Sequence, residues 1–69
     1  MKRANYRTMN LEKMRKLRKD AGMTQKQLGE KVLVSESMIN QIENGKKGVS
    51  RDLLKDIAEV LGVPARELL

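Results

Sequence analysis

The sequence lacks cysteine and histidine altogether, and it contains a single aromatic residue, Tyr6. Without cysteine and histidine, disulfide bonds, thiol chemistry and the usual zinc sites are excluded. With one aromatic residue the core must be built from Leu, Ile, Val, Met and Ala, which suits compact helices better than a strand-rich sandwich. The 69 residues permit one small domain of this kind.

Long apolar runs are also missing. No stretch approaches the length of a membrane span or of a signal-peptide core, so we expect a cytoplasmic protein without a membrane partner. Nor is there an acid pair or a glycine-rich phosphate loop at a useful spacing. The sequence therefore predicts no catalytic residue, no metal site, no cofactor and no evident small-molecule ligand.

Basic residues are plentiful and concentrated in the first half. Residues 1–31 hold ten of the 15 Lys and Arg but only three of the nine Asp and Glu. Such a region binds nucleic acid or anionic lipid in some proteins and only keeps others soluble. Residues 1–9 show no periodicity, and we expect a flexible basic arm there, either an ordinary disordered terminus or a segment that reaches DNA.

Helical periodicity begins at Asn10, a good N-cap, and continues to Ala21, after which Gly22 ends the helix. One side of this helix is apolar and carries Met14 and Leu17. The other side is basic and consists of Arg15, Lys16 and Lys19.

Arg18 lies at the edge of the apolar side, where a partly desolvated guanidinium needs a partner. Glu43 occupies the same kind of position on the helix that follows Ser35. We therefore predict a structural ion pair between Arg18 and Glu43, and the alternative is that Arg18 extends to water.

Two short amphipathic segments joined by a bend follow the first helix. Thr24 and Gln27 have the spacing of a capping box, in which each side chain pairs with the backbone amide of the other, so a helix begins there. Gly29 lets another backbone approach this helix closely. Residues 33–34 form the bend, and Ser35 can cap the second segment.

The second segment, residues 35–44, has an apolar and a polar face on a helical wheel. The apolar face consists of Met38, Ile39 and Ile42. The polar face consists of Glu36, Ser37, Asn40, Gln41 and Asn44. Amides and hydroxyls donate and accept hydrogen bonds, as reading of base edges requires. We predict a helix-turn-helix at residues 24–44 that presents this helix to DNA; the alternative is a polar face that is merely solvated.

The rest of the chain completes a predicted domain, residues 10–69. Ser50 can cap a fourth helix, which Gly62 ends. Pro64 suits the first turn of a short fifth helix that runs to the last residue, and the two terminal leucines either cover the core or pair with a second copy. The expected fold is all-α, with five short helices around one core.

Three blocks of the sequence form a recognisable set: L-R-x-x-x-G-M-T-Q-x-x-L-G from Leu17, I-x-x-I-E-N-G-K from Ile39, and L-x-x-I-A-x-x-L-G-V from Leu54. In this order they resemble the phage repressor and Cro class of helix-turn-helix regulators, the xenobiotic-response-element (XRE) family. The resemblance implies a compact, lambda-repressor-like five-helix domain whose third helix enters the major groove. It also implies a homodimer on two half-sites about one turn of DNA apart.

The resemblance implies roles for individual positions. Glu36, Ser37 and Gln41 match base-facing positions, and Asn40 lies on the same surface. Gln25 matches a glutamine that contacts phosphate, and the loop lysines are either further phosphate ligands or ordinary surface residues. The expected phosphate-binding residues are Gln25, Lys26, Asn44, Lys46 and Lys47.

Two positions depart from the family pattern. Leu33 stands in the bend where glycine is usual, so we expect either a slightly different turn or mild strain there. Glu36 stands where many relatives have a neutral residue. Either it accepts from a cytosine amino group or it is a helix-start acid that the dipole favours. Arg18 and Glu43, by contrast, follow the family pattern, because they match two residues that form a salt bridge in several members of the family.

The function that we expect is a sequence-specific regulator of transcription that binds double-stranded DNA, most simply a repressor at a palindromic operator. A DNA-binding antitoxin or a restriction-modification controller would share this pattern. A protein-interaction module that has lost DNA binding, and a peripheral membrane binder, are alternatives from other classes.

Overall fold

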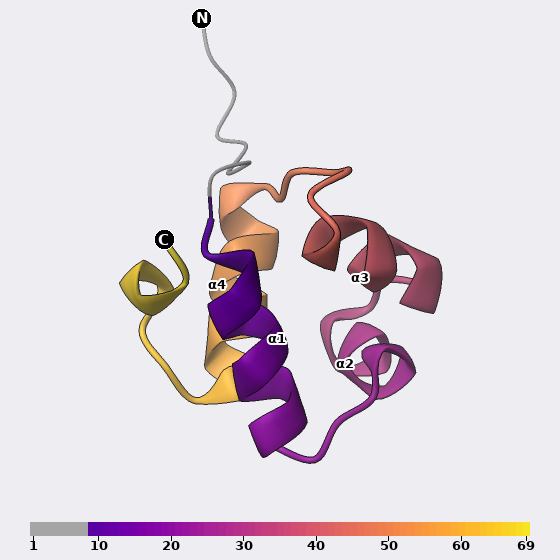
Figure 1. The fold of residues 1–69 in the computed structure, drawn as a ribbon, viewed down its shortest axis with the longest axis horizontal. Coiled ribbons are helices and arrows are strands. Elements are labelled where there is room, and N and C mark those ends of the chain that lie inside the picture. Colours follow the sequence, from indigo (N-terminus) through magenta and orange to yellow (C-terminus); the bar gives the residue numbers. More distant parts are fainter. Residues whose placement is uncertain (1–8) are drawn as a thin grey trace, which may run out of the picture.

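The computed structural model describes residues 9–69, which form four α-helices and one short 3-10 helix (Figure 1). The elements are α1 (Leu11–Asp20), α2 (Gln25–Val32), α3 (Glu36–Glu43), α4 (Arg51–Leu61) and η1 (Ala65–Leu68). The expected basic arm lies mostly outside the described residues. Met9, which we placed at its end, is buried in the core.

Each α-helix begins at the polar residue that the sequence analysis identified as its cap: Asn10, Thr24, Ser35 and Ser50. Thr24 and Gln27 form the reciprocal pair of a capping box, with hydrogen bonds of 3.0 and 2.9 Å. A cap of this kind stabilises a helix by about 1 kcal/mol relative to alanine. Four short helices therefore begin at positions that local side-chain chemistry determines.

The turn between α2 and α3 depends on two unusual positions. A Cβ atom at Gly29 would lie 2.6 Å from the carbonyl oxygen of Val34, so the close approach expected at this glycine is present. Leu33 ends α2 in the left-handed conformation, with φ of 64°, and 90% of its surface is exposed. An L-residue in this region is strained by about 1–2 kcal/mol.

One core joins all five elements. The side chains at its centre come from α1, α2, α3, α4 and η1, and their residues have no exposed surface: Met14, Leu28, Ile39, Ile42, Ile57 and Leu68. α2 packs against α3 and α4, and α1 packs against α3. As a result α2 and α3 lie together on one side of the molecule, away from η1 on the opposite side (Figure 1).

The predicted fifth helix is not an α-helix. Only Ala65–Leu68 are helical, as a 3-10 helix, and Pro64 precedes it without a side-chain cap. Its C-terminal end is tied to the domain, because Leu68 is buried and its carbonyl oxygen accepts a hydrogen bond of 2.7 Å from the amide of Asn10. The described residues therefore contain four α-helices and a 3-10 helix rather than five α-helices, and no strand.

None of the helices formed by residues 9–69 has both the length and the apolar character that crossing a membrane requires.

Candidate nucleic-acid interface

α3 has one face in the core and one face in solvent. Ile39 and Ile42 are fully buried on the first face. The polar side chains Glu36, Ser37, Asn40 and Asn44 are exposed on the other, and Gln41 is partly exposed. The structure thus gathers the predicted base-reading residues on one open surface. Because the buried face is locked into the core, this surface is held rigidly.

The predicted partners Arg18 and Glu43 meet beneath that surface. Nε of Arg18 lies 2.7 Å from Oε2 of Glu43, and Nη2 lies 3.1 Å from Oε1. Nη1 of Arg18 also donates to the carbonyl oxygen of Met23 at 2.8 Å. Both side chains are almost fully buried, with exposures of 8% and 0%. The pair therefore joins α1 to the C-terminal end of α3 in a buried position.

The carboxylate of Glu43 is stabilised in its charged form. Burial by itself raises the pKa of Glu43, but this effect is outweighed by hydrogen bonds from Arg18 and Gln25 and by the positive charges of Arg18 and Arg15. The pKa is consequently lowered from its ordinary value. Glu43 is an acceptor-only group at neutral pH.

Gln25, at the start of α2, is hydrogen-bonded to α3 on both sides of its amide. Its Nε2 donates to Oε1 of Glu43 at 3.0 Å, and its Oε1 accepts from Nδ2 of Asn40 at 3.3 Å. Asn44 in turn donates from Nδ2 to Oδ1 of Asn40 at 3.1 Å. We call Gln25, Asn40 and Asn44 the amide chain. It connects the buried carboxylate to the exposed surface, and the sequence patterns did not indicate it.

Gln41 and Ser37 form a second, smaller pair on the same face. Nε2 of Gln41 donates to Oγ of Ser37, one helical turn earlier, at 3.3 Å. Glu36, at the first turn of α3, is exposed and has no ion pair within residues 9–69. Both roles considered for Glu36 therefore stay open.

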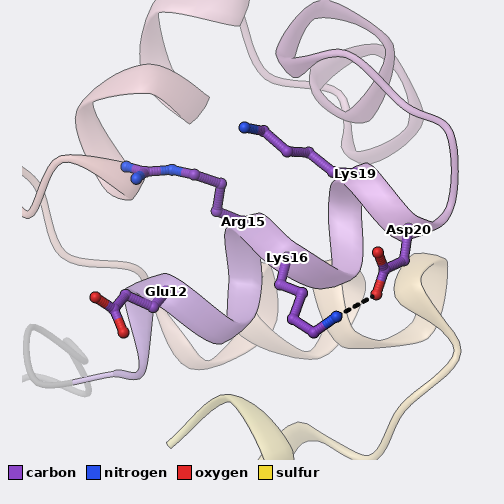
Figure 2. Close-up of a pocket in the computed structure, with 5 residues that line it drawn as sticks. All are labelled: Glu12, Arg15, Lys16, Lys19 and Asp20. Carbon is purple, nitrogen blue, oxygen red and sulfur yellow. Dashed lines mark hydrogen bonds and ion pairs between the residues drawn. The ribbon is translucent and has the colours of Figure 1, made fainter.

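The structure adds two basic residues of α1 to the surroundings of this face. Arg15 donates from Nη2 to the carbonyl oxygen of Glu43 at 3.2 Å, and its Nε lies 3.6 Å from Oε1 of the same residue. Figure 2 shows Arg15 and Lys19 extending to the same side of α1, towards α2 and α3. Lys16 points elsewhere and pairs with Asp20 at 3.1 Å.

The basic side of the predicted helix consisted of Arg15, Lys16 and Lys19. In the structure Arg15 and Lys19 extend towards α3, and Lys16 does not (Figure 2). An open hollow of about 300 Å³ lies along this side of α1, lined by Glu12, Arg15, Lys16, Lys19 and Asp20. The signal in the sequence was the spacing of four residues between Lys16 and Asp20, which favours an ion pair between them on the helix surface.

The predicted lysines lie on α2, which packs against α3, and on the loop that follows α3. Lys26 is exposed on the first turn of α2, and Lys46 and Lys47 are exposed in the loop after α3. None of the three forms an ion pair with another described residue. Among residues 9–69 there is also no group of three or more His, Cys, Asp or Glu side chains that could hold a metal ion.

A family model described as a helix-turn-helix matches residues 14–68. The chain belongs to the XRE-type family of helix-turn-helix regulators. The match covers most of the chain and includes α2, the turn and α3, so the resemblance predicted from the three sequence blocks is confirmed. No curated protein matches the chain.

Solved structures of other helix-turn-helix regulators have the same fold. The clp gene regulator ClgR from Corynebacterium glutamicum superposes with a TM-score of 0.79 at 31% identity, over 84% of this chain and 62% of that one. The restriction-modification controller C.AhdI from Aeromonas hydrophila has a TM-score of 0.79 at 27% identity, over 86% of each chain. SinR, a master regulator for biofilm formation solved in complex with DNA, has a TM-score of 0.79 at 28% identity, over 87% of this chain and 97% of that one. The chain thus spans less than two thirds of ClgR.

Proposed function

We propose that this helix-turn-helix domain is a sequence-specific DNA-binding regulator of transcription that inserts α3 into the major groove. The observation that carries the proposal is the division of α3 into a fully buried apolar face and an exposed row of hydrogen-bonding side chains. An α-helix with its side chains is about 10–12 Å across, which fits a major groove about 12 Å wide. A rigid helix with this polar face suits direct readout of base edges.

Base reading is assigned to three side chains of α3. Ser37 and Gln41 carry groups that donate and accept, and Glu36 carries a carboxylate that would accept from a cytosine amino group. All three lie on the exposed face. The similarity to SinR, whose structure contains DNA, supports placing this face against a duplex.

Phosphate binding is assigned to residues around that face. We retain the predicted set of Gln25, Lys26, Asn44, Lys46 and Lys47 and add Arg15 and Lys19 of α1. The positive charges of the arginine and the lysines in this set flank α3 from α1, α2 and the following loop. This arrangement would attract the DNA backbone from several directions and fix the orientation of α3 in the groove.

The simplest mode of action is a repressor that binds a palindromic operator as a homodimer. Of the two terminal leucines, Leu68 is fully buried, whereas Leu69 is 56% exposed beside η1. Leu69 is therefore the terminal leucine that remains available to a second copy. Sedimentation velocity with and without DNA measures the number of chains in the complex.

The experiment that tests this function is selection of bound sequences from random duplex DNA at near-physiological salt. We expect an enriched palindrome with half-sites about 10–10.5 base pairs apart. Enrichment of a single, non-repeated half-site would contradict the dimer. Salt-sensitive binding to every duplex without enrichment would contradict sequence specificity.

A second candidate is the control of a restriction-modification system, because the similarity to C.AhdI extends over 86% of that chain. An antitoxin with the same fold would bind DNA through the same face. The selected sequence separates these roles, since a controller's site would lie upstream of a restriction or methyltransferase gene and an antitoxin's site upstream of a toxin gene.

A further inference from the structure

The buried carboxylate of Glu43 determines how the amide of Gln25 is oriented. Its side chain has no exposed surface, and Arg18 and Gln25 donate to its oxygens. A carboxylate accepts hydrogen bonds and cannot donate them. Gln25 must therefore turn its NH₂ group towards Glu43, which leaves its carbonyl oxygen facing Asn40.

The orientation of Gln25 then determines the orientation of the next two amides. The oxygen of Gln25 needs a donor, and Nδ2 of Asn40 supplies it at 3.3 Å. The oxygen of Asn40 accepts in turn from Nδ2 of Asn44 at 3.1 Å. Reversal of Gln25 or Asn40 would set N–H against N–H at one link and oxygen against oxygen at the other, and reversal of Asn44 would set oxygen against oxygen at its single link. The amide chain consequently runs in one direction, from the surface to the buried charge.

We propose that Asn40 belongs with Gln25 and Asn44 to a cradle for one DNA phosphate and does not read a base. This inference rests on the proposed function and refines its assignment of residues. Each of the three amide nitrogens carries two hydrogens and uses one within the protein. Three N–H groups on one exposed surface are left to donate, and phosphate oxygens are acceptors only.

Reading of adenine by asparagine uses the nitrogen and the oxygen of one amide together. In Asn40 both atoms already have protein partners, which leaves one N–H and one lone pair, and the bonds to Gln25 and Asn44 hold the amide in an orientation set by the protein rather than by a base edge. Gln41 differs, because its only side-chain hydrogen bond within the described residues is the one from Nε2 to Ser37. Its oxygen and second N–H remain available for a base.

Arg15 supplies the positive charge that a phosphate site needs. Its guanidinium donates to the carbonyl oxygen of Glu43, the residue that anchors the amide chain, and 42% of its side chain is exposed. A guanidinium has five N–H donors, so most of them remain free for a further acceptor. Arg15 and the amide chain thus border the same end of α3.

The test compares Asn40→Ala with Gln41→Ala on every single-base variant of the selected operator, at one salt concentration. We expect Asn40→Ala to weaken binding to all variants by a similar factor, about tenfold, because a phosphate contact carries no base identity. Gln41→Ala should abolish the preference at one position. Loss of preference at one position with Asn40→Ala would overturn the proposal.

Asn40→Asp provides an independent check with the same side-chain shape. It cannot donate to Oε1 of Gln25, and it places a negative charge towards the phosphate. We expect binding to fall more than with Asn40→Ala and equally on all variants. A change of preference towards cytosine at one position would instead show that residue 40 reads a base.

The outcome for the wild-type chain separates failure of this inference from failure of the proposed function. If the wild type binds duplexes without sequence preference, the proposed function fails. The cradle would still predict that Asn40→Ala weakens this non-specific binding and that Gln41→Ala does not. An equal effect of the two variants on non-specific binding would overturn the cradle. Absence of any duplex binding would overturn both.

Discussion

Arg18 and Glu43, 25 residues apart in the sequence, form a buried ion pair in which Nε of Arg18 lies 2.7 Å from Oε2 of Glu43. The pair joins α1 to α3 and anchors the amide chain that reaches the exposed face of α3. One buried carboxylate therefore serves both the stability of the domain and the arrangement of its candidate DNA-binding surface.

Removal of one partner of this pair should destabilise the domain strongly. Arg18→Ala leaves the charge of Glu43 buried without its main partner, and we expect a loss of about 3–5 kcal/mol in the free energy of unfolding. Urea titration measures this loss. Lys16→Ala is the matched control, because it removes an exposed ion pair with Asp20 and should cost less than about 1 kcal/mol. Similar losses for the two variants would contradict the structural role of the buried pair.

Stability should depend on pH through Glu43. Its pKa is lowered in the folded state, so its contribution is fully present above the ordinary value of 4.5 and is lost as pH falls through the lower folded value. Unfolding free energies measured from pH 7 to pH 2.5 should therefore fall below about pH 4.5 in the wild type.

Glu43→Gln should flatten this decline, because the titrating group is gone. Glu67→Gln is the comparison, since the pKa of Glu67 is also lowered, by a hydrogen bond from Lys13 and by its charge, but at an exposed position. An equal change in the pH profile for both variants would argue against a special role of the buried carboxylate.

Leu33→Gly should stabilise the domain despite the loss of a large side chain. The left-handed conformation costs leucine about 1–2 kcal/mol, and glycine relieves this strain. Glycine also loses roughly 0.5–1 kcal/mol more than other residues in chain entropy on folding. We therefore expect the free energy of unfolding to rise by about 0.5–1 kcal/mol. Little burial is lost, because 90% of Leu33 is exposed. Leu33→Ala retains the Cβ atom and should show no such gain, and thermal unfolding of the three chains measures the difference.

Lys19→Ala should reduce the dependence of DNA binding on salt. Loss of one phosphate contact lowers the slope of log K against log salt by about 0.9 in magnitude. Lys16→Ala removes the same charge from the same helix but on the side that carries Asp20. We expect it to leave the slope nearly unchanged. Equal slopes for the two variants would remove α1 from the DNA-binding surface.

Local chemistry in the sequence was sufficient to place the four α-helices. Caps such as Thr24 act on amides three residues away, and the apolar and polar faces of α3 follow from helical geometry alone. The pairing of Arg18 with Glu43 was also predictable, because two ionised side chains at the edges of apolar faces require each other. These features depend on neighbours within one or two helical turns, or on a strong energetic requirement.

Other features depend on how the helices pack, and no local pattern contains that information. Met9 lies in the core, and the last residues form a 3-10 helix, because the chain around Leu68 is tied to Asn10 across the fold. The partners of Asn40 come from packing that brings the start of α2 beside α3.

The sequence by itself thus determined where the four α-helices lie, which faces are polar, and the family. Only the tertiary structure decided that Arg15 and Lys19, rather than Lys16, lie beside α3, and that the buried charge of Glu43 orients three surface amides. The physical reason is that a helical wheel gives the direction of a side chain about one axis. Its hydrogen-bond partners depend on distances between helices, which are determined when the core is packed.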